Sequence, residues 1–368
     1  MNQTDTIAVK KIFASYYENA DIQIPGIEQR EFGFGNIKKI DARHLNFATV
    51  SEFKRYLATN TPLFVSHSTG YYEFPGMTPI QKKNWKGADI VFDLDIHAEG
   101  KYGAYAKLDE VKHDLLKLVN DFLLNDFGMK KDSVVIVFSG NRGYHVHVRD
   151  TSFLTIGGEE RRELVDYVMG QGLDYTQFFN IDNKKRLVGP GPDESGYRGR
   201  LARGTIKLVT DNPSAISRLF SNNEKRDFFV GGIKEGNWSR TSLKFPDLIK
   251  RLKVVANGLP IHSVDTDAGV TQDLSKLIRV PNTIHGDTGM VAKIIGNGNE
   301  LDKVEKFNPW NDAVIPNNNE KTVRFVEDVP ELKMIGNDVG PYKKDETKKL
   351  PHQLALFFVC KGSATFVG

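Results

Sequence analysis

The stretch from residue 88 to residue 150 constrains the fold more than any other part of the chain. An apolar run typical of a strand, Ile90 to Phe92, leads directly into Asp93 and Asp95. Residues two apart on a strand point to the same face, so the two carboxylates are predicted to lie together while Leu94 points away. Paired carboxylates repel one another unless a cation or proton lies between them. Their hard oxygen atoms suit Mg²⁺ or Mn²⁺.

A second apolar run, 134–138, opens into a turn that glycines bracket. The turn carries three phosphate-binding side chains, Ser139, Arg142 and His145. A hydroxyl, a guanidinium and an imidazole on one turn, next to carboxylates on a neighbouring strand, indicate nucleotide chemistry. His147 can share the face of His145, but the sequence does not decide whether it belongs to the site.

A helix is predicted between these two strands, because apolar residues recur at helical spacing from Leu108 to Phe122. The order strand, helix, strand, strand over 89–149 predicts a small sheet with antiparallel pairs and a helical cover, as in ferredoxin-like or RRM-like palm domains. Residues 265–286 are expected to belong to the same palm domain.

Residues 152–258 are predicted to form a mostly helical inserted subdomain, and 1–151 with 259–368 the catalytic core. Between the predicted helices of the insertion, residues 184–207 contain seven basic residues and two acidic ones. We expect a loop here, either solvated or in contact with a phosphate backbone through Arg198, Arg200 and Arg203.

The composition excludes several classes of protein. A net charge of +3 means that any nucleic-acid surface must be a local basic patch. The single cysteine, Cys360, excludes an intrachain disulfide framework and fits a reducing cytoplasm. No apolar run approaches the roughly 20 residues of a membrane span, and the N-terminus lacks a signal-peptide pattern. We therefore expect a cytoplasmic protein without a membrane partner.

Together these segments resemble the catalytic small subunit of archaeal and eukaryotic DNA primases, over most of the chain. The family's Asp-x-Asp motif is met by Asp93 and Asp95, and its Ser-Gly-x-Arg-Gly-x-His motif by residues 139–145. Its Arg-Glu-Phe and a following arginine are matched by residues 30–32 and Arg43. The third motif is met by Asp267, Val270, Thr271, Arg279, Pro281 and His285.

The resemblance implies an α+β primase catalytic fold, with an RRM-like palm sheet, an N-terminal α/β unit and the helical insertion. Two Mg²⁺ or Mn²⁺ ions are expected on Asp93, Asp95 and Asp267. The resemblance also implies that Glu31 assists at the active site and that Arg43 contacts the incoming nucleotide. The expected phosphate-binding side chains are Ser139, Arg142, His145, Arg279 and His285.

The function that follows is template-directed synthesis of short primers from nucleoside triphosphates on single-stranded DNA, by an RNA polymerase type of nucleotidyltransferase. The product could also contain DNA. The resemblance implies a heterodimer with a large subunit that carries an iron–sulfur cluster, which one cysteine cannot hold. Within the same superfamily, the alternative is a stand-alone repair-type primase-polymerase.

Two alternatives come from other classes. An Asp-x-Asp glycosyltransferase would use a metal and a nucleotide, but would not explain the 139–145 turn or the pair Arg279 and His285. A non-catalytic nucleic-acid-binding scaffold is disfavoured because all three metal carboxylates are intact.

The sequence departs from the family in one respect. The family usually carries a zinc knuckle shortly after its first motif, but residues 97–113 contain no cysteine. Two histidines, His97 and His113, cannot close a tetrahedral site by themselves. We expect no zinc in this chain.

We predict that the purified protein contains no stoichiometric zinc, because Cys360 is alone and distant in sequence from His97 and His113. Elemental analysis after dialysis against a chelator checks this. A zinc content equal to the protein concentration would contradict it.

Overall fold

The computed structural model describes residues 1–96, 98–262, 269–334 and 337–367, which form two compact units. Unit 1 comprises residues 1–119 and 129–162 with the described residues from 269 onward, and unit 2 comprises 120–128 and 163–262. Helices and antiparallel sheets confirm the predicted α+β class. Among the described residues, every helix is too short or too polar to cross a lipid bilayer.

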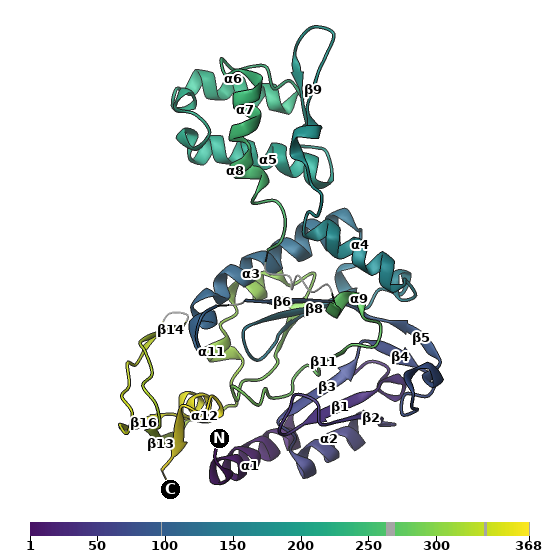
Figure 1. Cartoon of the computed structure of the whole chain (residues 1–368), viewed down its shortest axis with the longest axis vertical. Helices are drawn as coiled ribbons and strands as arrows, with labels where there is room; N and C mark the ends of the chain where they lie inside the picture. The colour runs from purple at the N-terminus through teal and green to yellow at the C-terminus, as the bar shows by residue number, and fades with distance from the viewer. Residues whose placement is uncertain (97, 263–268, 335–336, 368) are drawn as a thin grey trace. The chain divides into compact units, whose positions relative to one another are not determined.

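The central sheet of unit 1 has the strand order β12-β7-β8-β6, and all its pairs are antiparallel. Two of its strands, β6 and β8, are labelled in Figure 1. The predicted order of strand, helix, strand, strand is confirmed by β6 (Ile90–Asp95), α3 (Leu108–Lys117), β7 (Val134–Phe138) and β8 (Gly143–Val148). The fourth strand, β12 (Ile294–Asn297), pairs with β7 and was not predicted.

Helix α3 packs on β6 and β8 and covers one face of this sheet. Its buried side chains include Val111 and Leu115, which lie four residues apart on one helical face. Leu94 and Tyr144, opposite one another on β6 and β8, are fully buried. The helix continues as a π-helical segment, Leu118–Asp126.

A second sheet of unit 1 has the order β11-β3-β1-β2, formed by β1 (Phe32–Gly35), β2 (Ala42–Leu45), β3 (Phe64–Ser68) and β11 (Leu277–Arg279). Helices α1 (Gln3–Asn19) and α2 (Val50–Asn60) also belong to this part of unit 1. Phe53 of α2 packs against Phe32 with 4.8 Å between ring centroids and the rings tilted by 42°. The predicted return of the palm at 265–286 is wrong for β11, because this strand pairs with β3 and not with the central sheet. Residues 265–268 lie outside the described residues.

The rest of unit 1 consists of short elements and a small C-terminal sheet of order β16-β13-β17 with helix α12. Their bounds are β4 Gly70–Tyr72, β5 Trp85–Ala88, α4 Gly158–Val168 (which runs on into unit 2), α9 Gly269–Gln272, α10 Leu301–Lys306, α11 Pro309–Asp312, β13 Glu320–Phe325, β14 Leu332–Met334, β15 Asn337–Val339, β16 Thr347–Pro351, α12 His352–Cys360 and β17 Ala364–Phe366.

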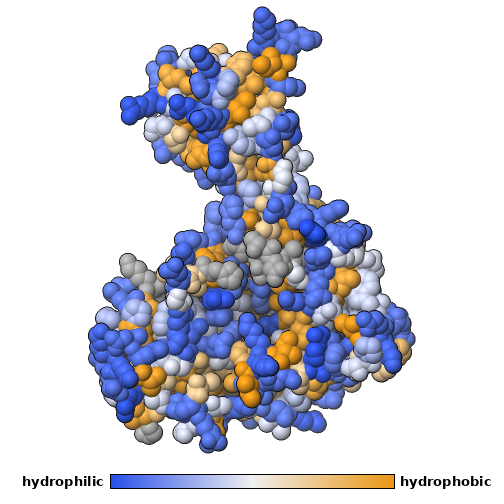
Figure 2. All heavy atoms as spheres, in the orientation of Figure 1, coloured by the Kyte–Doolittle hydropathy of each residue, from blue (hydrophilic) through white to orange (hydrophobic). Residues whose placement is uncertain are grey.

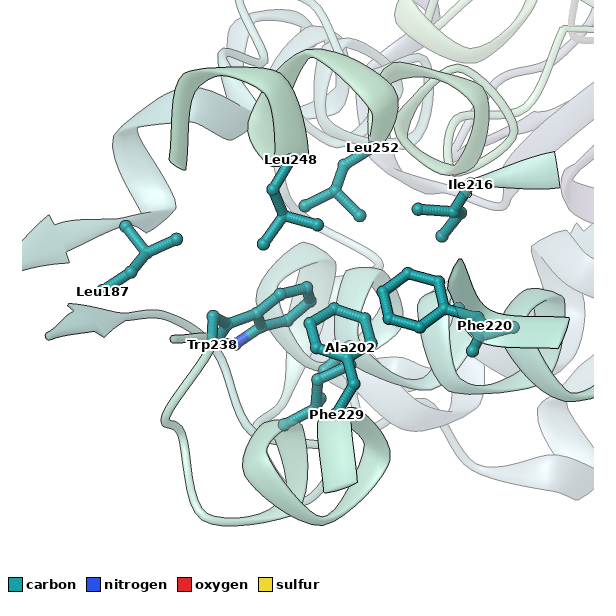
Figure 3. Packing of buried hydrophobic residues seen from close by; sticks show 10 residues of the cluster. Leu187, Ala202, Ile216, Phe220, Phe229, Trp238, Leu248 and Leu252 are labelled. Atoms are coloured by element: carbon teal, nitrogen blue, oxygen red, sulfur yellow. The ribbon is translucent and has the colours of Figure 1, made fainter. Parts of the chain in front are cut away.

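Unit 2 is mostly helical. Its elements are the hairpin β9 (Asn180–Ile181) and β10 (Leu187–Val188), and helices α5 (Gly196–Asp211), α6 (Asn223–Lys234), α7 (Phe245–Arg251) and α8 (Lys253–Ala256). The core gathers around the fully buried Trp238, with Phe229 and Leu248 beside it (Figure 3). The indole nitrogen of Trp238 donates to the carbonyl of Pro190 at 3.0 Å, so the buried N–H group is satisfied.

The predicted basic loop at 184–207 is wrong for its second half, which forms helix α5. Arg200 is buried and pairs with Asp126 at 2.7 Å, and its guanidinium lies 4.2 Å from the centroid of the Phe122 ring. Arg198 pairs with Glu194 at 2.6 Å, and Arg203 donates to the carbonyl of Pro192. The buried Arg200 is therefore part of the core of unit 2 and cannot reach a phosphate backbone.

A buried ion pair connects the segment before β1 with the start of β6. Arg30 donates to Asp89 at 2.7 Å, and both side chains are fully buried. Tyr71 donates to the other oxygen of Asp89, Oδ1, at 2.8 Å. Arg149 Nε lies 3.6 Å from Oδ2, the oxygen that Arg30 contacts. Arg161 of α4 donates to the carbonyls of Ala88 and Asp89 at 2.7 and 2.8 Å. The entry into β6 is therefore fixed by three arginines.

We predict that Asp89→Asn lowers the free energy of unfolding by about 3–5 kcal/mol, because it leaves Arg30 buried without a counter-charge. Chemical denaturation of the full chain measures the change. The control is Asp302→Asn, whose carboxylate pairs with Lys306 at the surface and should change stability by at most about 1 kcal/mol. Equal effects of the two substitutions would contradict the prediction.

Candidate active site

One cavity of about 460 Å³ collects most of the predicted site residues. Figure 2 shows that the visible face of unit 1 is hollowed near its centre, and that both hydrophilic and hydrophobic residues lie beside the hollow. The predicted residues that line the cavity are Asp93, Asp95, Ser139, Arg142, His145, Arg279 and His285. The structure therefore brings together side chains from three separate motifs.

The two carboxylates are placed by the pairing of β6 with β8. Asp93 lies opposite His145 and Asp95 opposite Gly143. Both carboxylate side chains are about a quarter exposed. His145 Nε2 lies 3.6 Å from Asp93 Oδ1, and Arg142 donates to Asp95 Oδ2 at 2.8 Å. As predicted from their spacing, the two aspartates share the face of the sheet that α3 does not cover.

The turn from Ser139 to Gly143 is held by its own hydroxyl group. Ser139 Oγ accepts hydrogen bonds from the backbone N–H groups of Asn141 at 3.3 Å and Gly143 at 3.2 Å. Gly140 has a φ of 80°, in the left-handed region, and a Cβ there would lie 3.0 Å from the Cβ of His285. A glycine is needed at this point because the backbone turns back directly against the neighbouring segment.

Arg279 and His285 reach the cavity from the other sheet and the segment that follows it. Burial lowers the pKa of Arg279 to about 10, so the guanidinium remains charged at neutral pH. Burial, reinforced by Arg279, also holds the pKa of His285 well below its ordinary value. The same two causes lower the pKa of His145 to about 3. Both imidazoles are therefore neutral at pH 7 and act as hydrogen-bonding groups, while the positive charge rests on the arginines.

Three buried nitrogen atoms of the site find no hydrogen-bond partner within the described ranges of the chain. They are Arg142 Nε, His145 Nδ1 and Arg279 Nη1. An unsatisfied buried donor costs about 1–3 kcal/mol. Anionic oxygens entering the cavity would satisfy such groups, so these nitrogens fit a phosphate ligand.

Sequence reasoning missed several residues of the cavity. Lys276 precedes β11 and Lys39 lies in the turn between β1 and β2; both line the cavity. Lys276 lies three residues before Arg279, and a search for basic residues around that motif would have found it. Lys39 gave no comparable signal. An apolar part of the lining comes from Ile40, Val270, Leu277 and Ile278.

Glu31 and Arg43 do not line this cavity. Glu31 is fully buried and accepts hydrogen bonds from Arg43 Nε at 2.6 Å and Lys83 Nζ at 2.8 Å. Burial raises the pKa of the Glu31 carboxyl, but these hydrogen bonds outweigh burial and leave it below its ordinary value. Their predicted roles toward the nucleotide stay predictions.

The third predicted metal ligand, Asp267, lies outside the described residues. Helix α9 begins at Gly269, and Thr271 in it donates to the carbonyl of Val91 at 2.6 Å, so α9 is anchored on β6. Within the described ranges no group of three or more His, Cys, Asp or Glu side chains is placed to hold a metal. Cys360 is buried in α12.

The backbones of β6 and β8 approach so closely at Gly143 that a larger residue there should disturb the site. A Cβ there would lie 1.9 Å from the carbonyl oxygen of Leu94, so Gly143→Ala must push the two strands apart at Asp95. We expect it to destabilise the protein by about 1–3 kcal/mol and to abolish activity. The control is Gly191→Ala, whose Cβ would meet nothing closer than 4.0 Å. Chemical denaturation and an activity assay of both variants check this; wild-type stability and activity in Gly143→Ala would contradict it.

The model of the family described as "DNA primase small subunit" matches residues 92–296. Relatives named "DNA primase small subunit PriS" include one from Methanococcoides burtonii, 30% identical and covering 97% of each chain. Another, from Methanosarcina acetivorans, is 31% identical and covers 100% of this chain and 98% of the relative. A third, from Archaeoglobus fulgidus, is 29% identical over 97% of this chain and 98% of its own. This chain belongs to the DNA primase small subunit family.

Proposed function

We propose that this protein is the catalytic subunit of a DNA primase and joins nucleoside triphosphates into short RNA primers on single-stranded DNA. The observation that carries the proposal is the composition of one cavity. Two carboxylates of β6 face it together with Arg142 of the 139–143 turn and Arg279 of β11. Acidic and basic groups meeting in one cavity are what nucleotidyl transfer needs.

The cavity has the two parts that a nucleotide requires. Its polar part contains Arg142, Arg279 and the unsatisfied nitrogens, which suit a triphosphate. Its apolar part contains Ile40 and Leu277, which suit the flat face of a base. The volume of about 460 Å³ lies within the range of small-molecule sites.

Asp93 and Asp95 fit a site for divalent cations, because both carboxylates share one face and are partly exposed to the cavity. Asp267 is proposed as a further ligand. When bound, Mg²⁺ or Mn²⁺ supplies positive charge at the attacking and leaving oxygens of the displacement. We propose no zinc, since the residues around His113 offer no thiolate.

The side chains of the protein would act mainly by position and charge. Arg142 and Arg279 would neutralise charge on the transferred phosphoryl group, in a cavity where partial burial strengthens the interaction. His145 and His285, which are neutral, would donate or accept hydrogen bonds without adding charge. The Ser139 hydroxyl oxygen accepts two hydrogen bonds from the backbone of the turn, so its O–H group would be available to donate to a phosphate oxygen.

As a small subunit, the protein is proposed to work with a large subunit that carries the iron–sulfur cluster, in the cytoplasm. Family membership disfavours the glycosyltransferase alternative. The stand-alone primase-polymerase alternative predicts activity that does not depend on any partner, and an assay with and without large subunit separates the two.

We predict that Asp93→Asn and Asp95→Asn each lower primer synthesis by more than about a hundredfold, the order of effect expected when a charged group at the reacting atoms is removed. Incubation with poly-dT, ATP and Mn²⁺, followed by separation of the oligomers, measures it. Stability should change by no more than about 1 kcal/mol, since the Arg142–Asp95 pair is partly exposed.

The matched control is Asp302→Asn, which neutralises an exposed carboxylate that does not line the cavity. It should retain wild-type synthesis. Near-normal activity of the Asp93 or Asp95 variant, on protein with unchanged stability, would refute the metal assignment.

A further inference from the structure

The turn between β1 and β2, residues 36–41, exposes an apolar side chain beside the candidate active site. Ile37 is 92% exposed, more than any other large hydrophobic side chain in the described ranges of the chain. Lys38 and Lys39 follow it and are also exposed. At this exposure Ile37 adds little to the packing of the described part of the fold. A molecule that binds to this turn would bury it.

Hydrogen bonds fix the turn. The Asp41 carboxylate accepts from the backbone N–H groups of Asn36, Ile37 and Lys38 at 2.7, 2.8 and 3.1 Å. These bonds lower the pKa of the Asp41 carboxyl, which keeps it ionised at neutral pH. Lys10 of α1 donates to the side chain of Asn36 at 2.7 Å. The backbone at Ile37 is therefore fixed before any partner binds, and little of its conformational freedom is lost on binding.

The same turn forms part of the wall of the active-site cavity. Lys39 and Ile40 line the cavity that contains Asp93 and Asp95. Any ligand that covers the outer residues of the turn therefore lies at the mouth of the site. A polynucleotide matches this surface, because ammonium groups contact phosphates and an apolar side chain packs against the face of a base.

We propose that Ile37 and Lys38 contact the single-stranded DNA template as it passes the active site. Lys38 meets a backbone phosphate, and Ile37 packs against a base next to the one being copied. The inference rests on the proposed function, which requires a template strand at this cavity. A docked protein could also cover Ile37, but the adjacent lysines and the shared cavity wall favour the nucleic acid.

The first test measures binding of fluorescent oligo-dT to the full chain by anisotropy at several salt concentrations. Lys38→Gln should flatten the plot of log affinity against log salt by about 0.7 unit, the value for one phosphate contact on a single strand. Ile37→Ser should raise the Kd about five- to tenfold, at the lower end of the range for losing one base contact, and leave the slope unchanged. The KM for ATP at saturating DNA should stay at the wild-type value in both.

Matched controls are Lys321→Gln, an exposed lysine on β13, and Ile7→Ser, an exposed isoleucine on α1. Both should bind oligo-dT as wild type does. Wild-type affinity and slope in Ile37→Ser and Lys38→Gln would overturn the proposal and would leave a protein partner as the occupant of the turn.

A second test locates the strand directly. Cys360 is buried, so Ile37→Cys introduces the reactive thiol for an environment-sensitive fluorophore. Oligo-dT should change the emission of this label and leave that of a label at Ile7→Cys unchanged. A silent label at position 37 on protein that binds DNA would overturn the inference alone. Absence of primer synthesis by the wild type, with a responding label, would instead contradict the proposed function.

Discussion

The register of β6 against β8 is the constraint on which the candidate active site depends. It sets Asp93 opposite His145 and Asp95 opposite Gly143, and the missing Cβ at Gly143 lets the strands approach. Because side chains alternate along a strand, a shift of one residue would turn both carboxylates toward the face that α3 covers. The fully buried Leu94 holds this register, since it would be exposed by the same shift.

The second requirement is that two sheets meet at one cavity. The carboxylates come from the central sheet, whereas Arg279 comes from β11 of the other sheet. The buried pair of Arg30 with Asp89 joins the segment before β1 to the residue before β6. Breaking a buried ion pair is costly because it leaves a buried charge without a partner. The pair therefore fixes the position of the residue at which the chain enters β6. Catalytic geometry here thus depends on a contact outside the cavity.

The basic side chains of unit 2 and those at the cavity have different roles. In unit 2, Arg200 is buried in the core, and Arg198 pairs with Glu194, which lies just before helix α5. At the cavity, by contrast, Lys39, Lys276, Arg142 and Arg279 converge from three segments of unit 1. A chain of nearly balanced charge can therefore present a local basic surface, and one such surface lies beside the carboxylates.

The sequence by itself determined the family, the α+β class, the central strand–helix–strand–strand unit and seven side chains of the cavity. These follow from spacing within a strand or turn, which covalent geometry sets locally. Only the tertiary structure decided that β11 joins the N-terminal sheet, that Arg200 is buried with Asp126, that Glu31 is enclosed by Arg43 and Lys83, and that Lys39 lines the cavity. Each of these depends on contacts between residues distant in the chain, where the choice of partner is made by packing and by the cost of burying an unpaired charge.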